Sequence, residues 1–274
     1  ELEWASRGVK ARRKRNQRRL AQVYEERSRL KADKSSYNRM IAKIEVPPIE
    51  SQLNSKVAAE FFKVYKSFGD LKILDKFSLR IMKGDRIGVL GKNGAGKTTF
   101  LKLLLGQLEP DQGRVKTAHA MEFAYFDQKR EALDQTKTIK QILCPEGGDY
   151  IDVRGKPRHV CGYMKDFMFN PEQVNEPVRI LSGGQQNRLL LAKTLASPKD
   201  CLILDEPTND LDMETLEMLE EIISQYKGTL LIVSHDRDFL DQTVSKILAF
   251  EGNAIVDGCI GGYSDYIEMK QKKE

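Results

Sequence analysis

The sequence of 274 residues is poor in cysteine and histidine, with four of the first and three of the second. The cysteines lie far apart and form no Cys-x-x-Cys pair, which argues against a zinc ribbon or a disulfide scaffold and favours a reducing cytoplasm. Long apolar runs are also missing, because stretches such as Cys201–Leu204 and Leu230–Val233 fall far short of the roughly 18 to 20 residues that span a bilayer. We therefore expect neither a transmembrane helix nor a secretory signal.

Acidic residues are absent from residues 10–19, where seven of the ten side chains are Lys or Arg. Residues 1–45 contain 14 basic and 6 acidic residues, a net charge of +8, and the other 229 residues carry −3. Gly and Pro are missing from Val9 to Ile44, which predicts a long helix that Pro47 and Pro48 end. Such a basic helix is typical of a segment that binds nucleic-acid phosphates, although a solvated helix face is the alternative.

One glycine-rich stretch, Gly91–Thr99, fits the spacing G-x-x-x-x-G-K-[ST] and stands between an apolar run and an amphipathic one. This order predicts a strand, a phosphate-binding loop and a helix, because glycines let consecutive backbone N–H groups turn toward an anion. A glycine-rich turn in a protein without nucleotide is the alternative. The residues expected to bind nucleotide are Gly91, Asn93, Gly94, Ala95, Gly96, Lys97, Thr98 and Thr99, with Thr98 also a magnesium ligand.

A second signal is the buried-strand pattern Cys201–Leu204 followed directly by Asp205 and Glu206. Mg²⁺ prefers hard oxygen ligands, and a carboxylate at the end of such a strand can supply one, which suits Asp205. Glu206 can then act as the general base toward water. Alone the pattern is most often structural, but the phosphate loop upstream favours a magnesium and hydrolysis site.

The order of the apolar segments predicts an α/β fold, and the phosphate loop at Gly91–Thr99 indicates the P-loop NTPase type. Strand formers from Lys56 to Leu79 predict a small antiparallel sheet, and Arg114–Phe126 predicts one further strand. Alternating strands and helices after Leu181 predict a mostly parallel sheet. The expected domains are a basic helical linker (1–45), a connector (46–55), a nucleotide-binding domain (56–262) with a helical subdomain (about 129–195), and a charged tail (263–274) that continues in a longer protein.

Further motifs accompany the phosphate loop, and the whole set resembles the ATP-binding cassette ATPases over roughly Lys56–Gly262. The resemblance implies ATP and Mg²⁺ as cofactors, ATP hydrolysis, and a second cassette, in the same chain or in a homodimer. The motif residues are the Q-loop Gln128, the signature Leu181, Ser182, Gly183, Gly184 and Gln185, the D-loop Asn209, Asp210, Leu211 and Asp212, and the switch histidine His235.

The resemblance also implies a role for each motif. The signature serine and glycines close over the γ-phosphate that the other cassette holds. Glu206, His235 and Gln128 are the implied catalytic residues, and Gln128 can also bind Mg²⁺. Phe68 stands where the family places an aromatic ring under adenine, although Tyr65 is an alternative and Phe68 also suits a core position.

Within this superfamily, the basic arm without membrane spans resembles the ABC-F group of soluble proteins with two cassettes. Segments such as Gly261–Tyr266 and Arg158–Tyr163 resemble the second half of such a protein, comprising the end of the linker and the second cassette. The implied partner is nucleic acid (ribosomal RNA, tRNA or branched DNA) bound through residues 10–43. Gln185 departs from the glutamate that is frequent in this group. Two alternatives stay open: the ATPase subunit of a membrane transporter, and a scaffold that binds ATP but barely hydrolyses it.

Overall fold

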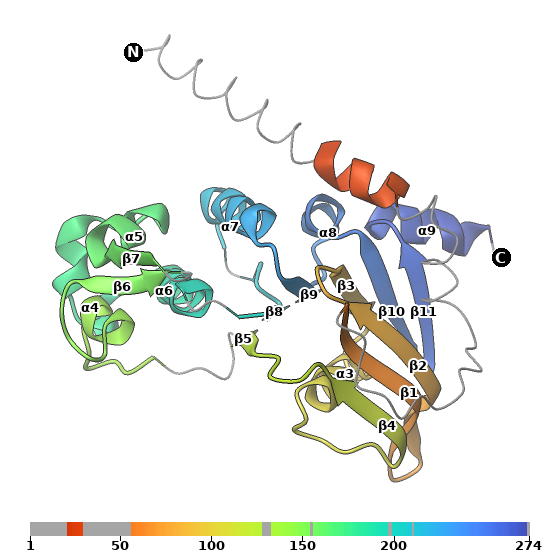
Figure 1. Cartoon of the computed structure of the whole chain (residues 1–274). Helices are drawn as coiled ribbons and strands as arrows, with labels where there is room; N and C mark the ends of the chain where they lie inside the picture. Colours follow the sequence, from red (N-terminus) through yellow and green to blue (C-terminus); the bar gives the residue numbers. More distant parts are fainter. Residues whose placement is uncertain are drawn as a thin grey trace. The chain divides into compact units, whose positions relative to one another are not determined.

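The computed structural model describes residues 21–29, 56–127, 133–153, 156–196, 199–209 and 211–272 (Figure 1). The chain forms two compact units, the first with residues 1–119 and 236–274 and the second with residues 120–235. Among the described helices, none combines the length and apolar character that crossing a membrane requires.

The first unit contains the predicted antiparallel sheet, with the strand order β2-β1-β4. Its strands alternate between an inner and an outer face, so that Phe61 faces Leu79 and Val115 on the neighbouring strands and all three lie on the inner side. Phe61 is 1% exposed. The strands are β1 (Val57–Phe68), β2 (Leu71–Met82) and β4 (Gln112–Thr117).

A second group of strands in this unit has the order β11-β10-β3, in which β10 (Lys246–Gly252) runs parallel to β3 (Arg86–Gly91) and antiparallel to β11 (Ile255–Ile260). Helix α3 (Lys97–Leu104) joins the two sheets through the fully buried Phe100. Its ring centroid lies 5.1 Å from that of Phe61 and 5.6 Å from that of Phe250. This packing fixes the start of α3 and therefore the phosphate loop before it.

Three helices complete the first unit: residues 21–29, α8 (Arg237–Thr243) and α9 (Tyr263–Gln271). Figure 1 shows the first of them, drawn in orange-red, beside α8 and α9. The rest of the predicted basic helix lies outside the described residues. Within the segment 263–274, which the sequence indicates as a charged tail, residues Tyr263–Gln271 form α9, in which Tyr266 is buried and its hydroxyl donates to Glu251.

The second unit is built on three parallel strands in the order β9-β8-β5, as the apolar runs predict. These are β5 (Phe123–Asp127), β8 (Cys201–Asp205) and β9 (Thr229–Val233). The prediction of one strand over Arg114–Phe126 is wrong, because Ala120 adopts a left-handed turn (φ 57°) that ends β4 and redirects the chain into β5.

The rest of the second unit is mostly helical, as expected, but it also contains an antiparallel hairpin of β6 (Tyr150–Val153) and β7 (Lys156–His159). Two longer helices, α6 (Gly183–Ala196) and α7 (Met213–Gln225), accompany the strands. The shorter helices are α4 (Ile139–Leu143), α5 (Val160–Asp166), and the 3₁₀ turns Pro171–Asn175 and Val178–Ile180.

Candidate functional site

The phosphate loop turns between β3 and α3, and two of its glycines cannot be replaced without a clash. Gly91 has φ 146° and Gly96 has φ 113°. A Cβ atom on Gly91 would lie 2.5 Å from the carbonyl oxygen of Phe250, and one on Gly96 would lie 2.6 Å from Cγ2 of Ile73. Both positions therefore require glycine for their backbone conformation and for space, as the sequence motif predicts.

Lys97 is the first residue of α3, and its side chain folds back over the loop. The Nζ atom donates to the carbonyl oxygens of Gly91 (2.5 Å) and Lys92 (3.3 Å). The loop residues Lys92 to Gly94 and the following Thr98 are exposed. A positive group above a glycine-rich turn at a helix N-terminus fits a bound phosphate.

Asp205 ends β8, and a neighbouring strand positions its carboxylate. The hydroxyl of Tyr125 on β5 donates to Oδ2 of Asp205 over 3.0 Å. The rest of β8 is core, and burial raises the pKa of the Cys201 thiol to about 12, with a smaller contribution from Asp200. Strand β8 is therefore a buried element that carries one oriented carboxylate, that of Asp205, at its end.

Glu206 follows directly and has an unusual backbone conformation, with φ 50°. Its N–H donates to the carbonyl oxygen of Val233 over 2.8 Å. Its Oε1 lies 3.4 Å from Nε2 of His235, the residue two positions beyond the end of β9. A left-handed conformation costs a residue with a Cβ atom of order 1 kcal/mol, and such strain clusters at functional sites.

The loops that carry these two side chains are tied together. The hydroxyls of Thr208 and Ser234 lie 3.2 Å apart, one on the loop after Glu206 and the other just before His235. The histidine side chain is 59% exposed and that of Glu206 is 22% exposed. The pair therefore stands at the end of β8 and β9 with one side open to solvent, where water and a phosphate can reach it.

The signature residues open helix α6. Oγ of Ser182 accepts from the backbone N–H of Gln185 (3.3 Å), and the Gln185 side chain accepts from the N–H of Ser182 (2.9 Å). This reciprocal pair is a capping box that holds the exposed serine and Gly183 at the start of the helix. Gln185 can form it because Gln and Glu both accept at this position. Gly184 belongs to the same first turn.

Arg188, four residues after Gly184 in helix α6, connects this helix to the D-loop. Its Nη1 donates to Oγ1 of Thr215 (3.0 Å) and to Oδ2 of Asp212 (3.4 Å). Asp212 is the N-cap of α7 and accepts from the N–H of Thr215. Hydrogen bonds from the side chain and backbone of Thr215, and then the charge of Arg188, hold the pKa of Asp212 below its usual value.

Two other predicted residues stand apart from these groups. Phe68 ends β1 and is 52% exposed, so it is not a core residue, and the Lys66 ammonium lies 5.6 Å from its ring centroid. Tyr65 is half-buried on the same strand. Gln128 and Asp210 lie outside the described residues.

The hydrogen-bond donors and oxygen ligands of these residues are of the kinds that bind Mg-ATP. The loop offers backbone N–H groups and one ammonium group to phosphates, and it contains the hydroxyl of Thr98. Asp205 contributes a hard oxygen of the kind that Mg²⁺ prefers. The phosphate loop belongs to the first unit, and Asp205, Glu206, His235 and the signature belong to the second.

Comparison with known proteins identifies the class. Residues 74–209 match the family model described as ABC transporter, so the chain belongs to the ABC ATPases, in which the cassette binds ATP with Mg²⁺. The fold agrees with the solved structure of the ADP conformation of MJ1267, an ATP-binding cassette of an ABC transporter. That match has a TM-score of 0.58 at 18% sequence identity and covers 78% of this chain and 94% of that one.

Within this class, the chain resembles an ABC-F cassette of the Uup kind. It is 43% identical to the ATP-binding protein Uup of Escherichia coli (strain K12) over 275 aligned positions, which cover 98% of this chain and 42% of that protein. It is 35% identical to the energy-dependent translational throttle protein EttA of the same strain, over 99% of this chain and 48% of that protein. The chain therefore spans less than half the length of these relatives.

Two residues with a clear place in the structure were not predicted from the sequence. Tyr125, which positions Asp205, lies in a short strand whose partner cannot be read from local spacing. Arg27 is one of many arginines in a basic segment, and no local sequence pattern distinguishes it from the others.

Proposed function

We propose that this cassette hydrolyses Mg-ATP, with Glu206 as the general base and His235 as the residue that orients it. The observation that supports this proposal best is the 3.4 Å approach of Nε2 of His235 to Oε1 of Glu206, with the glutamate held in a left-handed conformation. A base that accepts a proton from water must have a fixed direction. The imidazole N–H can hold the carboxylate, or it can donate to a phosphate oxygen when a nucleotide is bound.

In this proposal, the phosphate loop binds the nucleotide. Lys97 exchanges its contacts with the loop carbonyls for the β- and γ-phosphates. Thr98, Asp205 and Gln128 are the residues that would hold Mg²⁺, which neutralises phosphate charge and aligns the reacting oxygens when it is bound. Phe68 offers an exposed ring for adenine at the end of β1.

A second cassette completes each site. Ser182 and the two glycines after it stand at the start of α6 with the serine exposed, so they are available to the γ-phosphate of another cassette. The second cassette belongs to the same natural chain, since the relatives are more than twice as long as this sequence, or to a second copy. ATP binding then closes two cassettes, and hydrolysis opens them.

We further propose that closure moves the basic arm on a nucleic acid in the cytoplasm. The arm is the segment 1–45, with a net charge of +8, and the connector is 46–55. One relative carries translation in its name, which supports RNA of the translation machinery as the partner of residues 10–43. DNA has the same backbone chemistry and is the other outcome of the test.

The test uses the complete protein that contains this sequence, with Glu206→Gln to prolong the ATP-bound state. Crosslinking in cells and sequencing of the nucleic acid attached to residues 10–43 is expected to recover RNA of the translation machinery. Recovery of abundant DNA with little RNA would identify DNA as the partner in place of RNA. Copurification with a membrane protein without nucleic acid would favour a transporter subunit. ATP turnover that does not depend on a second cassette would contradict the composite site.

A further inference from the structure

In the described part of the basic arm, residues 21–29, a buried arginine connects the arm helix to helix α8 of the same unit. Arg27 is 3% exposed, whereas Arg29 on the same helix is exposed. Nε and Nη2 of Arg27 donate to the carbonyl oxygen of Val244 (3.2 and 2.9 Å), and Nη2 also donates to that of Asp241 (2.7 Å). A basic segment that binds only solvent or nucleic acid does not need such a buried cation.

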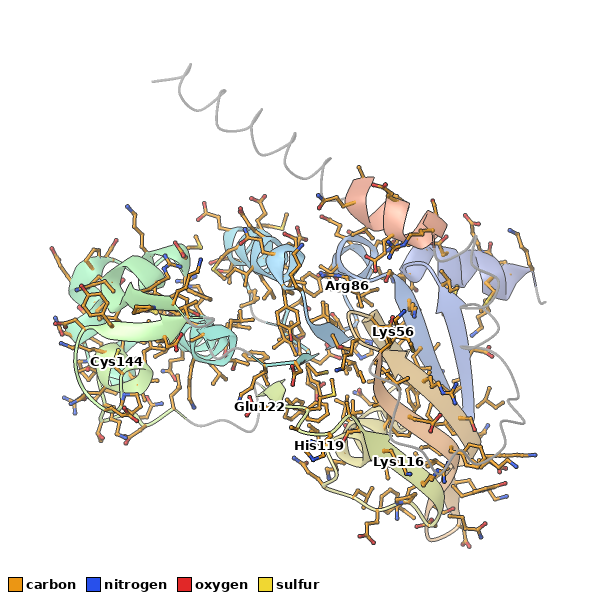
Figure 2. All side chains as sticks on the ribbon, in the orientation of Figure 1. Lys56, Arg86, Lys116, His119, Glu122 and Cys144 are labelled. Atoms are coloured by element: carbon orange, nitrogen blue, oxygen red, sulfur yellow. The ribbon has the colours of Figure 1, made fainter. Side chains whose placement is uncertain are left out.

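The acceptors of Arg27 are carbonyl groups at the C-terminal end of α8. Carbonyls in the last turn of a helix have no partner within the helix, and the helix dipole favours a cation there. A second arginine binds the same helix end: Arg86, labelled in Figure 2, donates through Nε to the carbonyl oxygen of Thr243 over 2.8 Å. Ser245 next to them donates to Glu26 of the arm helix (3.3 Å).

The segment Gly261–Asp265 forms another part of the Arg27 site. Asp265 and Asp241 lie 3.5 and 3.8 Å from the guanidinium nitrogens. A Cβ atom on Gly262 would lie 2.2 Å from Nη2 of Arg27 and 2.1 Å from Oδ1 of Asp241. A side chain at position 262 would therefore displace the guanidinium or the carboxylate of Asp241.

Two elements connect the Arg27 site with the nucleotide motifs: helix α8, whose carbonyl groups accept from Arg27, and strand β3, whose Arg86 donates to Thr243 at the end of that helix. Helix α8 begins directly after His235, with Asp236 as its N-cap, and its seven residues span only about 10 Å. Strand β3 begins at Arg86 and ends at Gly91 of the phosphate loop. One short helix and one strand thus separate the arm contact from the γ-phosphate sensor and from the loop.

We infer that Arg27 is the positioning residue through which α8 and β3 transmit the nucleotide state of the cassette to the basic arm. The inference rests on the proposed function, in that it supplies the connection between ATP binding and nucleic acid. A shift of His235 toward a γ-phosphate moves α8, a rigid single element, and its C-terminal carbonyls carry the guanidinium and the arm helix with them. Coupling between two binding sites is reciprocal, so nucleic acid bound to the arm also changes the ATP affinity.

The variants that test this inference remove the anchor and leave the rest of the arm in place. Arg27→Gln removes the buried cation, and Arg29→Gln removes the same charge from an exposed position on the same helix. Gly262→Ala leaves Arg27 in the chain but blocks its site. All are made in the complete protein with Glu206→Gln, and circular dichroism confirms folding.

The first measurement is the nucleic-acid affinity with and without ATP. The ratio of the two affinities is expected to be about fivefold or more in the parent and in Arg29→Gln. It should fall to within about twofold of 1 in Arg27→Gln and Gly262→Ala, while ATP affinity without nucleic acid changes little. An unchanged ratio in Arg27→Gln overturns the inference and leaves the proposed function intact.

The second measurement does not depend on nucleic acid or on the variants. Amide hydrogen exchange of residues 21–29 is followed in the parent before and after ATP is added. A change in exchange supports transmission even if no nucleic acid responds to ATP, in which case only the proposed function fails. Exchange that is the same with and without ATP overturns the inference.

Discussion

Nε2 of His235 and Oε1 of Glu206 lie 3.4 Å apart, although the two residues are 29 positions apart in the sequence. They meet because β8 and β9 are parallel neighbours in which Asp205 pairs with Val233, so that both side chains emerge at the same end. Since parallel strands present their carboxyl ends at one edge, a base and its orienting residue can come from two consecutive strands.

The role of Glu206 is tested by Glu206→Gln in the complete protein. This change keeps the shape of the side chain but removes the basic group, so ATP binding should persist while turnover falls about 10²- to 10⁴-fold. Phosphate release and the binding of a fluorescent ATP analogue measure the two effects. Glu146→Gln, an exposed glutamate in the same unit, should change neither. Near-normal hydrolysis in Glu206→Gln would contradict the proposed role of Glu206 as the general base.

The phosphate loop is tested by Lys97→Ala. Loss of charge-assisted hydrogen bonds to phosphate should weaken ATP binding by roughly 1.5 to 3 kcal/mol, about 10- to 100-fold in Kd. Equilibrium titration with nucleotide measures this effect. Lys102→Ala, in the last turn of the same helix, is the matched control and should bind ATP normally. Equal affinities for the two variants would contradict phosphate binding by the loop.

The helix cap at Asp212 gives a stability that depends on pH. Thr215 and, less strongly, Arg188 lower its pKa in the folded state, so this contribution is present above the unfolded pKa, about 3.9, and is lost as pH falls through the folded value. Asp212→Ala should cost about 0.5 to 2 kcal/mol at pH 7. The difference in melting temperature from the parent should shrink below about pH 4. Asp152→Asn, an exposed change on β6, should show no such dependence, and a constant difference for Asp212→Ala down to pH 2 would contradict the account.

A buried ion pair in the first unit gives a test of the fold. Nζ of Lys246 lies 2.8 Å from Oδ1 of Asp85, and the two side chains are 8% and 11% exposed. Lys246→Met should destabilise the protein by about 3 to 5 kcal/mol, because it leaves a buried carboxylate without its partner.

Denaturant unfolding measures this cost, and the double variant Asp85→Asn with Lys246→Met should recover part of it. The exposed pair of Lys272 and Glu268 is the control, since Lys272→Met should change stability by less than about 1 kcal/mol. Similar losses of stability in Lys246→Met and Lys272→Met would show that the pair of Lys246 and Asp85 is not isolated from water.

Local motifs were predicted well from the sequence because their geometry depends on adjacent residues. The phosphate loop at Gly91–Thr99, with a strand before it and a helix after it, is of this kind. The prediction of one strand over Arg114–Phe126 was wrong because it used local propensity alone. Strand propensity continues through the segment, but the left-handed turn at Ala120 divides it between two sheets.

The sequence by itself determined the class of this protein, since the phosphate loop, the signature and the strand ending in Asp205 and Glu206 are linear patterns with their own chemistry. Only the tertiary structure decided which distant groups act together. Tyr125 reaches Asp205 across 80 positions and Arg27 reaches Val244 across 217, and both contacts follow from strand order and helix packing. Local propensity acts over a few residues, whereas such pairs exist only after the sheets and helices have been assembled.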